Sequence, residues 1–160
     1  MAHEIAIHVY PTDCDMLGHV NHATMITFLE HARWALLERE LVHGAGGAAN
    51  VWEAFRSMGV FTVVRHVDIS YHAQVLPGAD IVIRSGLVSV GRTSFIVRQD
   101  VLQARGGARA AEASITFVCV GADGRPVPVP DAWRDVFPRW DEPGAPARPP
   151  YGVAPGTAVP

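Results

Sequence analysis

One short stretch of the chain, between residues 10 and 22, gathers two aspartates, a glycine and two histidines. It reads Tyr-Pro-Thr-Asp-Cys-Asp-Met-Leu-Gly-His-Val-Asn-His and runs directly into an amphipathic segment. A helix N-terminus offers unpaired backbone N–H groups and the positive end of the helix dipole, so polar side chains there can orient and stabilise developing negative charge. The composition of this stretch therefore indicates chemistry on a carbonyl group.

The flanking elements make the stretch a strand-to-helix loop. Residues Glu4 to Tyr10 alternate polar and apolar side chains, as a half-buried strand does. From Ala23 to Glu40 the apolar residues follow helical spacing. Asn21 is expected to cap this helix at its start. Asp13 and Gly18 are assigned to the shape of the loop, because aspartate bonds nearby backbone in turns and glycine adapts to them.

The rest of the chain predicts a short helix and four more strands. Asn50 stands three residues before Glu53, a capping-box arrangement for a helix from Val51 to Met58, and Gly59 follows as its C-cap. The strands are expected at Val60 to Tyr71, Ile81 to Val90, Thr93 to Gln103 and Ala108 to Val120. A helix must then cover one face of an antiparallel sheet. The other face looks apolar enough to form a subunit contact.

Length and composition fit one domain. The chain has 160 residues, of which 49% are hydrophobic and 18% charged, and its formal net charge is -3. Such a chain can bury a core of its own, and its charge gives no reason to expect nucleic acid or an anionic membrane as a partner. We expect a single domain over residues 1–141, followed by a tail rich in Pro, Gly and Ala over residues 142–160.

The cysteines and the apolar segments indicate a cytoplasmic protein. Cys14 and Cys119 are far apart and have no zinc-like spacing, which argues against a disulfide scaffold and a structural metal. The N-terminus has no basic segment followed by a long apolar run, and nowhere do about 18 consecutive apolar residues occur. We therefore expect no export signal and no membrane span.

The stretch from Asp13 to His22, followed by Phe28-Leu-Glu-His-Ala-Arg33, resembles the signature of the hotdog-fold acyl-CoA thioesterases of the 4-hydroxybenzoyl-CoA thioesterase type. Three later segments resemble the family's strands in order and spacing: Val67 to Tyr71, Gly91 to Phe95 and Ser114 to Cys119. The resemblance implies an α+β hotdog fold, in which a five-stranded antiparallel sheet wraps a long helix. It also implies a homodimer or homotetramer with active sites at the subunit interface.

The same resemblance places the catalytic carboxylate on Asp15. An ionised carboxylate either attacks the thioester carbonyl or activates water to do so. The carbonyl oxygen must also be polarised by a backbone N–H, and by position Gly59 or Val60 is the candidate donor. The competing interpretation is that Asp15 is a turn residue that bonds nearby backbone; the surrounding motif favours the chemical role.

Two histidines compete for an assisting role. In some branches of the family a histidine seven residues after the aspartate assists, and that position is His22. In others the histidine at His19 and the asparagine at Asn21 are more prominent, and the chain carries all three residues. His19 and His22 could also bind a metal together with Asp15, but no fourth ligand is visible, and we expect no metal.

Other polar residues are weaker candidates. The resemblance suggests that Arg92, with Thr93 and Ser94, contacts the phosphates of coenzyme A, although a solvated turn arginine is an equal alternative. Three polar residues alternate along one predicted strand: His66, Asp68 and Ser70. Side chains two apart on a strand project in parallel and do not converge as a nucleophile and its base must.

The expected function is hydrolysis of an acyl-CoA thioester to a carboxylic acid and free coenzyme A. It needs no cofactor, since coenzyme A is part of the substrate, and a thioester on a carrier protein would react in the same way. The alternatives are a hotdog hydratase or dehydratase, whose motifs find no match in this sequence, and a non-catalytic acyl-CoA-binding protein. Short, long-chain and aromatic acyl groups all stay open.

Overall fold

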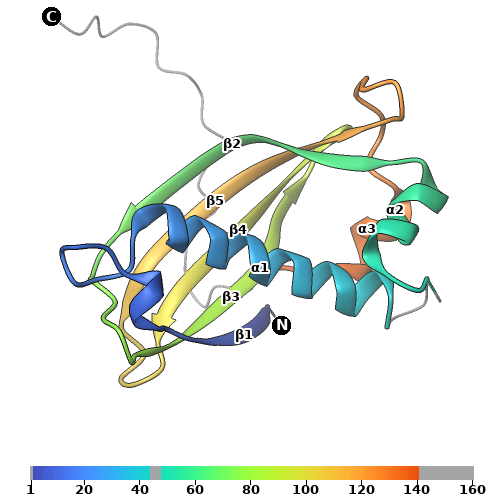
Figure 1. Ribbon diagram of the computed structural model, residues 1–160. Helices are drawn as coiled ribbons and strands as arrows, with labels where there is room; N and C mark the ends of the chain where they lie inside the picture. Colours follow the sequence, from blue (N-terminus) through green and yellow to red (C-terminus); the bar gives the residue numbers. More distant parts are fainter. Residues whose placement is uncertain (1, 44–47, 141–160) are drawn as a thin grey trace, which may run out of the picture.

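A long helix lies across one face of an antiparallel sheet, as the computed structural model in Figure 1 shows. The structure describes residues 2–43 and 48–140, so the predicted tail lies outside the described residues. The elements, in chain order, are β1 (His3–His8), the 3-10 helix η1 (Pro11–Asp13), α1 (His22–Leu41), α2 (Val51–Met58), β2 (Phe61–Tyr71), β3 (Asp80–Val90), β4 (Ser94–Gln103), β5 (Arg109–Val120) and α3 (Asp131–Val136).

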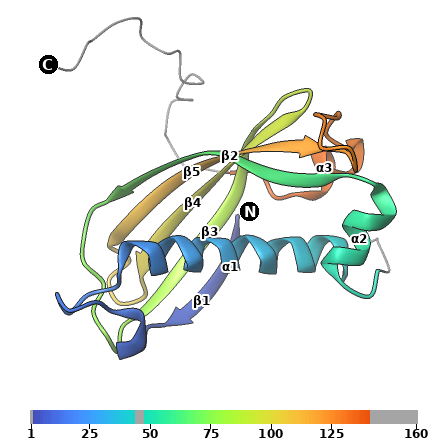
Figure 2. The same ribbon diagram turned by 45° about the horizontal axis from the view of Figure 1, so that its top comes forward.

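The five strands form one sheet in the order β1-β3-β4-β5-β2, and each neighbouring pair is antiparallel. The sheet curves around α1, which is plain in the turned view of Figure 2. This is the hotdog fold predicted from the sequence. The order leaves β1 and β2 at the two edges of the sheet, and β2 is the longer of them with 11 residues.

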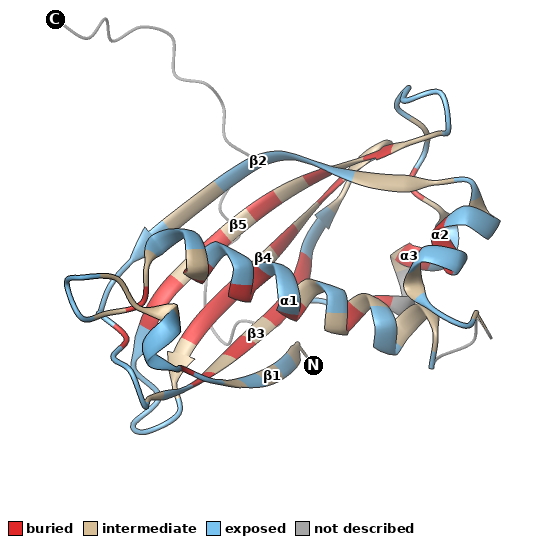
Figure 3. Cartoon of the chain, in the orientation of Figure 1, coloured by how far each residue is buried: buried red, intermediate tan, exposed pale blue. Residues whose placement is uncertain are grey.

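Helix α1 begins and packs as its sequence predicts. The side chain of Asn21 accepts a hydrogen bond from the backbone N–H of Ala23 at 2.8 Å, which satisfies a donor at the helix start. Five apolar residues at helical spacing are buried against the sheet: Met25, Phe28, Leu29, Ala32 and Leu36. Figure 3 shows that buried residues recur along β3, β4 and β5, the three central strands of the sheet.

A buried polar cluster joins α1 to the sheet. Gln99 of β4 is fully buried, and its amide nitrogen donates to the carbonyl oxygen of Leu29 at 3.0 Å and to the hydroxyl of Ser85 at 2.8 Å. Its amide oxygen accepts a hydrogen bond from Arg33 of α1 at 2.9 Å. The side-chain amide of Gln99 is therefore satisfied on both its nitrogen and its oxygen inside the core.

Helix α2 has the predicted caps. The side chain of Asn50 accepts from the N–H of Glu53 at 2.9 Å, and the carboxylate of Glu53 accepts from the N–H of Ala49 at 2.8 Å. Gly59 ends the helix with a φ of 64°, a left-handed conformation that glycine adopts without strain. This cap turns the chain from α2 directly into β2.

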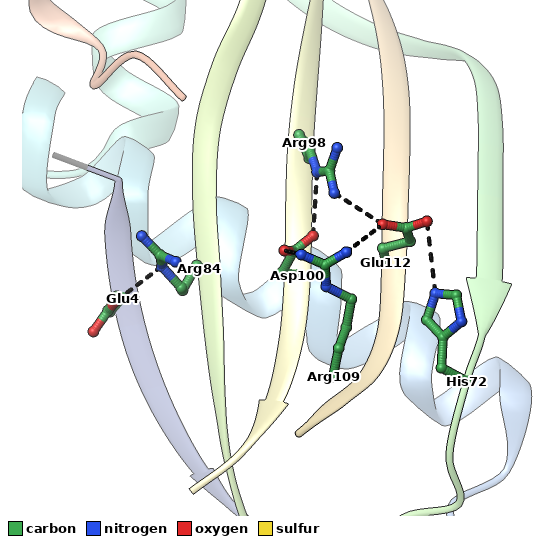
Figure 4. A network of polar contacts seen from close by, with 7 residues as sticks. All are labelled: Glu4, His72, Arg84, Arg98, Asp100, Arg109 and Glu112. Atoms are coloured by element: carbon green, nitrogen blue, oxygen red, sulfur yellow. Dashed lines mark hydrogen bonds and ion pairs between the residues drawn. The ribbon is translucent and has the colours of Figure 1, made fainter. Parts of the chain in front are cut away.

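The outer face of the sheet, away from α1, carries ion pairs (Figure 4). Asp100 is buried there between Arg98 at 3.2 Å and Arg109 at 2.8 Å, and both arginines also bind Glu112. Trp140 lies beside Arg98: the guanidinium carbon of Arg98 is 5.1 Å from the centroid of the Trp140 ring. The prediction of an apolar outer face is wrong for this part of the sheet, because these charges sit among the outward-facing strand positions.

Candidate functional site

The loop that leads into α1 is a small hairpin closed by backbone hydrogen bonds. Cys14 and Val20 form an isolated antiparallel bridge. Within it the N–H of Asp15 donates to the carbonyl oxygen of His19 at 3.1 Å, and the N–H of Gly18 donates to that of Asp15 at 3.0 Å. Gly18 has a φ of 82°, which requires glycine at this turn. The hairpin presents Asp15 on its half-buried side.

Both carboxylate oxygens of Asp15 accept hydrogen bonds. Oδ1 accepts from the backbone N–H of Leu17 at 2.9 Å, and Oδ2 accepts from the side-chain amide of Asn21 at 3.4 Å. Asn21 therefore has two contacts: its oxygen caps α1 and its nitrogen holds Asp15. The carboxylate is fixed in direction at the N-terminus of a helix of 20 residues.

The neighbouring Asp13 has other side-chain partners and stabilises the loop. One oxygen of its carboxylate accepts from the backbone N–H of Tyr10 at 2.8 Å, and its backbone carbonyl accepts from the N–H of Asn21 at 3.1 Å. These contacts agree with the structural role expected for Asp13. The two carboxylates thus have different partners, and that of Asp15 is the one that bonds to the side chain of Asn21, the N-cap of α1.

Neither histidine side chain bonds to the Asp15 carboxylate in the described part of the chain. His22 is the first residue of α1 and is exposed, while the Nδ1 atom of His19 lies 3.3 Å from the carbonyl oxygen of Val20. Residues 2–43 and 48–140 contain no group of three or more His, Cys, Asp or Glu side chains placed to hold a metal ion.

Tyr71 belongs to this region but was missed in the sequence. It ends strand β2, and its hydroxyl donates to the carbonyl oxygen of His22 at 3.4 Å. Burial raises the pKa of the Tyr71 hydroxyl above its ordinary value. Tyr71 ends the strand predicted from Val60, which was the available signal, but strand alternation does not reveal that the end of β2 meets the start of α1.

The candidate amide donors lie at the opposite end of the molecule. Figures 1 and 2 both show α2 and the start of β2 beyond the C-terminal end of α1, and a helix of 20 residues is roughly 30 Å long. A single chain therefore does not bring Gly59 or Val60 to Asp15. The N–H of Gly59 donates to the carbonyl oxygen of Arg56 at 3.2 Å, whereas that of Val60 makes no hydrogen bond to any described residue.

The turn between β3 and β4 lies at the same end of the molecule as Gly59 and Val60. Ser94 pairs with Val118, which in turn pairs with Val63 near the start of β2. Arg92 is exposed, and its backbone carbonyl accepts from the N–H of Val129 at 2.8 Å. Arg92, Thr93 and Ser94 therefore lie in one turn at the end of the sheet that holds Val60, and away from Asp15.

A cavity of about 170 Å³ opens beside the start of β2, between the second half of α1, α2 and the sheet. Its walls include Arg33, Trp34, Trp52, Phe55, Phe61 and Phe117. Three apolar residues earlier on α1 do not line this cavity: Met25 and Leu29 are buried in the core, and Ile26 is exposed. The aromatic residues at 34, 52 and 55 were the signal that could have found it.

The chain is similar to known thioesterases. A family model described as the thioesterase-like superfamily matches residues 9–137. The long-chain acyl-CoA thioesterase FadM of Escherichia coli K12 is 29% identical over 106 residues, which cover 66% of this chain and 74% of FadM.

Solved structures agree in fold. YbaW, a probable thioesterase from Escherichia coli whose crystal structure is known, is 26% identical in sequence, and the two structures superpose with a TM-score of 0.68. The match covers 78% of this chain and 88% of the YbaW chain. A thioesterase from Thermus thermophilus, crystallised with coenzyme A and Zn, is also 26% identical, with a TM-score of 0.67 and coverage of 83% and 94%. In residues 2–43 and 48–140 of this chain, no helix has the length and apolarity that crossing a membrane requires.

Proposed function

We propose the function of this chain from one premise, which is that it belongs to the thioesterase-like superfamily. The proposed reaction is hydrolysis of an acyl-CoA thioester to a carboxylic acid and free coenzyme A, with Asp15 as the reacting carboxylate. The names of FadM and of the coenzyme A complex support the substrate class. The observation that carries the proposal is the Asp15 carboxylate, held by Leu17 and Asn21 at the start of α1.

Two routes from Asp15 are chemically complete. As a general base, the carboxylate takes a proton from water, the water oxygen adds to the thioester carbon, and the departing thiolate receives that proton. As a nucleophile, the carboxylate itself adds to the carbon, coenzyme A leaves as thiolate, and water then hydrolyses the mixed anhydride. Both routes build negative charge on the carbonyl oxygen. Both therefore require a hydrogen-bond donor aimed at that oxygen.

The donor is proposed to be the N–H of Val60 from a second copy of the chain. Val60 is favoured over Gly59 because the Gly59 N–H already donates to Arg56. Strand β2 is a sheet edge with exposed Val63, Val64, Val67 and Tyr71, a feature that invites pairing with another strand. Antiparallel pairing of two β2 strands about a twofold axis sets the start of one against the end of the other.

That pairing would complete the site. The Tyr71 hydrogen bond to His22 shows which end of β2 lies near Asp15. The start of the second copy's β2, with its Val60, would therefore approach Asp15 of the first copy. The turn holding Arg92, Thr93 and Ser94 would come with it, which supports a role for that turn in binding coenzyme A. We propose a homodimer as the smallest active unit; two such dimers could form a tetramer without changing the site.

The assisting role is proposed for Asn21, with His19 and His22 as secondary groups, because Asn21 is the one of the three whose side chain bonds to the Asp15 carboxylate. The proposed location is a reducing cytoplasm, on the ground that Cys14 and Cys119 have no spacing typical of a disulfide scaffold. A thioester on a carrier protein has the same reacting end and would be hydrolysed by the same groups.

The test replaces Asp15 and compares it with its neighbour. Asp15→Asn is expected to lower the release of free thiol from acyl-CoA by roughly a hundredfold or more, the loss typical of removing a general base or nucleophile. Asp13→Asn is the matched control, because an asparagine oxygen can still accept from the Tyr10 N–H. Equal turnover in wild-type and folded Asp15→Asn protein would refute the assignment. Tight acyl-CoA binding without turnover by the wild type would identify a binding protein instead.

A further inference from the structure

A segment near the end of the described chain holds the turn between β3 and β4. This segment, called the strap (residues 126–140), comes after β5 and contains α3. Within it, the N–H of Val129 donates to the carbonyl oxygen of Arg92 at 2.8 Å. The Nη2 atom of Arg134 donates to the carbonyl oxygen of Gly91 at 3.0 Å. Two successive peptide groups of the turn are therefore held from the strap.

The strap is itself fixed near its start, in its middle and at its end. The N–H of Val127 donates to a carbonyl oxygen of β5 at 2.9 Å, and the N–H of Trp140 donates to one of β3 at 2.8 Å. In α3, Trp133 is buried, and its ring centroid lies 5.7 Å from that of Phe55 in α2. Figures 1 and 2 both show α3 beside α2 at this end of the molecule. The position of the turn thus depends on β3, β5 and α2 together.

The hydrogen bond from Arg134 has a charged donor. Hydrogen bonds of a guanidinium are roughly twice as strong as those between neutral groups. The Nε atom of the same side chain lies 3.4 Å from a carboxylate oxygen of Asp131, and 33% of the side chain is exposed. Asp131 therefore orients the guanidinium while its Nη2 atom holds the Gly91 carbonyl. Arg134 acts on the turn through a backbone atom.

The turn that is held in this way presents an exposed cation, the side chain of Arg92. Within residues 2–43 and 48–140, no acidic side chain pairs with this guanidinium. A guanidinium can bind a phosphate through two N–H groups at once. A binding group whose backbone is ordered beforehand loses less conformational entropy when its ligand arrives. The arrangement therefore suits the binding of a phosphate by a preordered turn.

We infer that the strap is a positioning element for coenzyme A, with Arg134 and the N–H of Val129 as the groups that set the Arg92 turn. This inference rests on the proposed function, in which that turn binds the phosphates of coenzyme A. Neither positioning group acts on the reacting atoms, so their loss weakens substrate binding and leaves the rate of the bound substrate unchanged. Helix α3 also links two parts of the site, because α2, against which it packs, leads into Val60.

The first experiment measures the Kd of coenzyme A by calorimetry, which requires no turnover. Arg134→Met keeps much of the apolar stem and removes the guanidinium. We expect the Kd to rise by roughly threefold to tenfold, because only part of the energy of the lost hydrogen bond appears as affinity. Arg125→Met is the matched control, since it removes an arginine from the turn after β5 whose side chain is 86% exposed. It should keep the wild-type Kd.

Two outcomes of this experiment would overturn the inference. One is an unchanged Kd in folded Arg134→Met protein, with folding checked by thermal unfolding. The other is an equal rise in Arg134→Met and Arg125→Met, because loss of positive charge at this end of the molecule would then explain both.

Val129→Pro is a second variant that leaves every charge in place. Proline has no backbone N–H, so the hydrogen bond to the Arg92 carbonyl is lost. Position 129 already lies between Pro128 and Pro130, so the change adds to an existing run of prolines. The Kd of coenzyme A should rise here as well. A wild-type Kd in folded Val129→Pro protein would refute the role given to the Val129 N–H.

The second experiment compares two thioesters of one acyl group that the wild type hydrolyses. One is the coenzyme A thioester, and the other is the N-acetylcysteamine thioester, which has no phosphate. Arg134→Met should raise KM for the coenzyme A thioester without changing kcat, and it should have the wild-type kcat/KM for the N-acetylcysteamine thioester. An equal loss of kcat/KM with both thioesters would overturn the inference, because it would show a general distortion of the site.

The third experiment tests whether Arg134 acts through Arg92. Arg92→Ala should raise the Kd of coenzyme A, and adding Arg134→Met to it should raise the Kd little further, since two residues of one unit are not additive. The same rise from Arg134→Met in both backgrounds would overturn the positioning role. If the wild type binds coenzyme A with the expected order of Kd values but hydrolyses no acyl-CoA, the proposed function fails and the role of the strap stands. Absence of saturable coenzyme A binding to the wild type would overturn the inference.

Discussion

The hydroxyl of Tyr71 donates a hydrogen bond of 3.4 Å to the backbone carbonyl oxygen of His22, and this contact ties the end of strand β2 to the first turn of helix α1. The two residues are 49 positions apart in the chain. Because Asn21 precedes His22 and bonds to Asp15, the position of β2 is linked to that of the proposed reacting carboxylate through two hydrogen bonds. An edge strand that can pair with a second copy is thus attached to the site.

Tyr71→Phe tests this link. The variant keeps the ring and removes the hydroxyl, so we expect a loss of about 0.5–1 kcal/mol in the free energy of unfolding, at the low end for a hydrogen bond because 49% of Tyr71 is exposed. Thiol release should fall by a few-fold, since small displacements of a reacting group are costly. Urea unfolding and steady-state kinetics measure the two effects. Tyr10→Phe, at an exposed tyrosine in η1's N-cap position, should change neither.

Subunit mixing tests the shared site. Asp15→Asn and Val60→Pro should each be inactive as homodimers, the second because proline has no backbone N–H. When the two are unfolded together and refolded, half of the dimers are mixed, and each mixed dimer has one site with both groups intact. We expect about a quarter of the wild-type activity to return, as random twofold assembly requires.

The control for this experiment is each variant refolded alone, with its dimer content measured by light scattering. Val60→Pro must dimerise, since a variant that cannot pair would give no mixed dimers. If both variants dimerise and mix, and activity does not return, then Asp15 and Val60 do not act together across the interface.

Local sequence patterns predicted most of the fold, because caps and strand alternation depend on residues close together in the chain. Asn21, Asn50 and Gly59 all cap as predicted, and the strands begin and end within about two residues of their predicted limits. For the segment Pro126 to Trp140 the sequence left open a coil or a helical turn packed on the body, and the structure forms α3 there. The choice depends on the packing of Trp133 against Phe55 and Phe95, which no local pattern encodes.

The arrangement of the candidate site could be predicted only in part. The contact between Asn21 and Asp15 spans six positions and lies within the motif. The distance between Asp15 and Val60, the cavity at Trp34 and the ion pairs around Asp100 depend instead on how strands and helices meet in space. Alternation along a strand does not encode these tertiary contacts. It shows only that successive side chains lie on opposite faces of the sheet, and it does not show which residues of other elements they contact.

Gln99→Leu tests the buried cluster that joins α1 to the sheet. The substitution keeps the approximate size of the side chain but leaves the Ser85 hydroxyl and the Arg33 guanidinium without their partner. We expect the free energy of unfolding to fall by about 2–4 kcal/mol, because unsatisfied buried polar groups retain their full desolvation cost. Gln103→Leu on the same strand is the matched control. Its hydrogen bond to the Gln74 carbonyl is exposed, so its loss should cost well under 1 kcal/mol.

The thiol of Cys119 should make stability depend on pH in the alkaline range. Cys119 is fully buried, and this burial raises the pKa of its thiol from 9.0 to about 11, against a smaller opposing effect of Arg134. A folded pKa above the unfolded one means that the neutral thiol stabilises the fold fully below pH 9, and that this contribution is lost as pH rises through about 11.

The measurement compares wild type and Cys119→Ala by urea unfolding at pH 8 and pH 11. The variant is less stable at pH 8 because of the cavity it leaves. The gap between the two proteins should narrow by on the order of 2 kcal/mol at pH 11, since only the wild type must keep a thiol neutral there. Cys14→Ala, at a cysteine that is partly exposed in the Asp15 hairpin, should show a smaller change. A constant gap between wild type and Cys119→Ala would mean that the thiol ionises alike in the folded and unfolded chain.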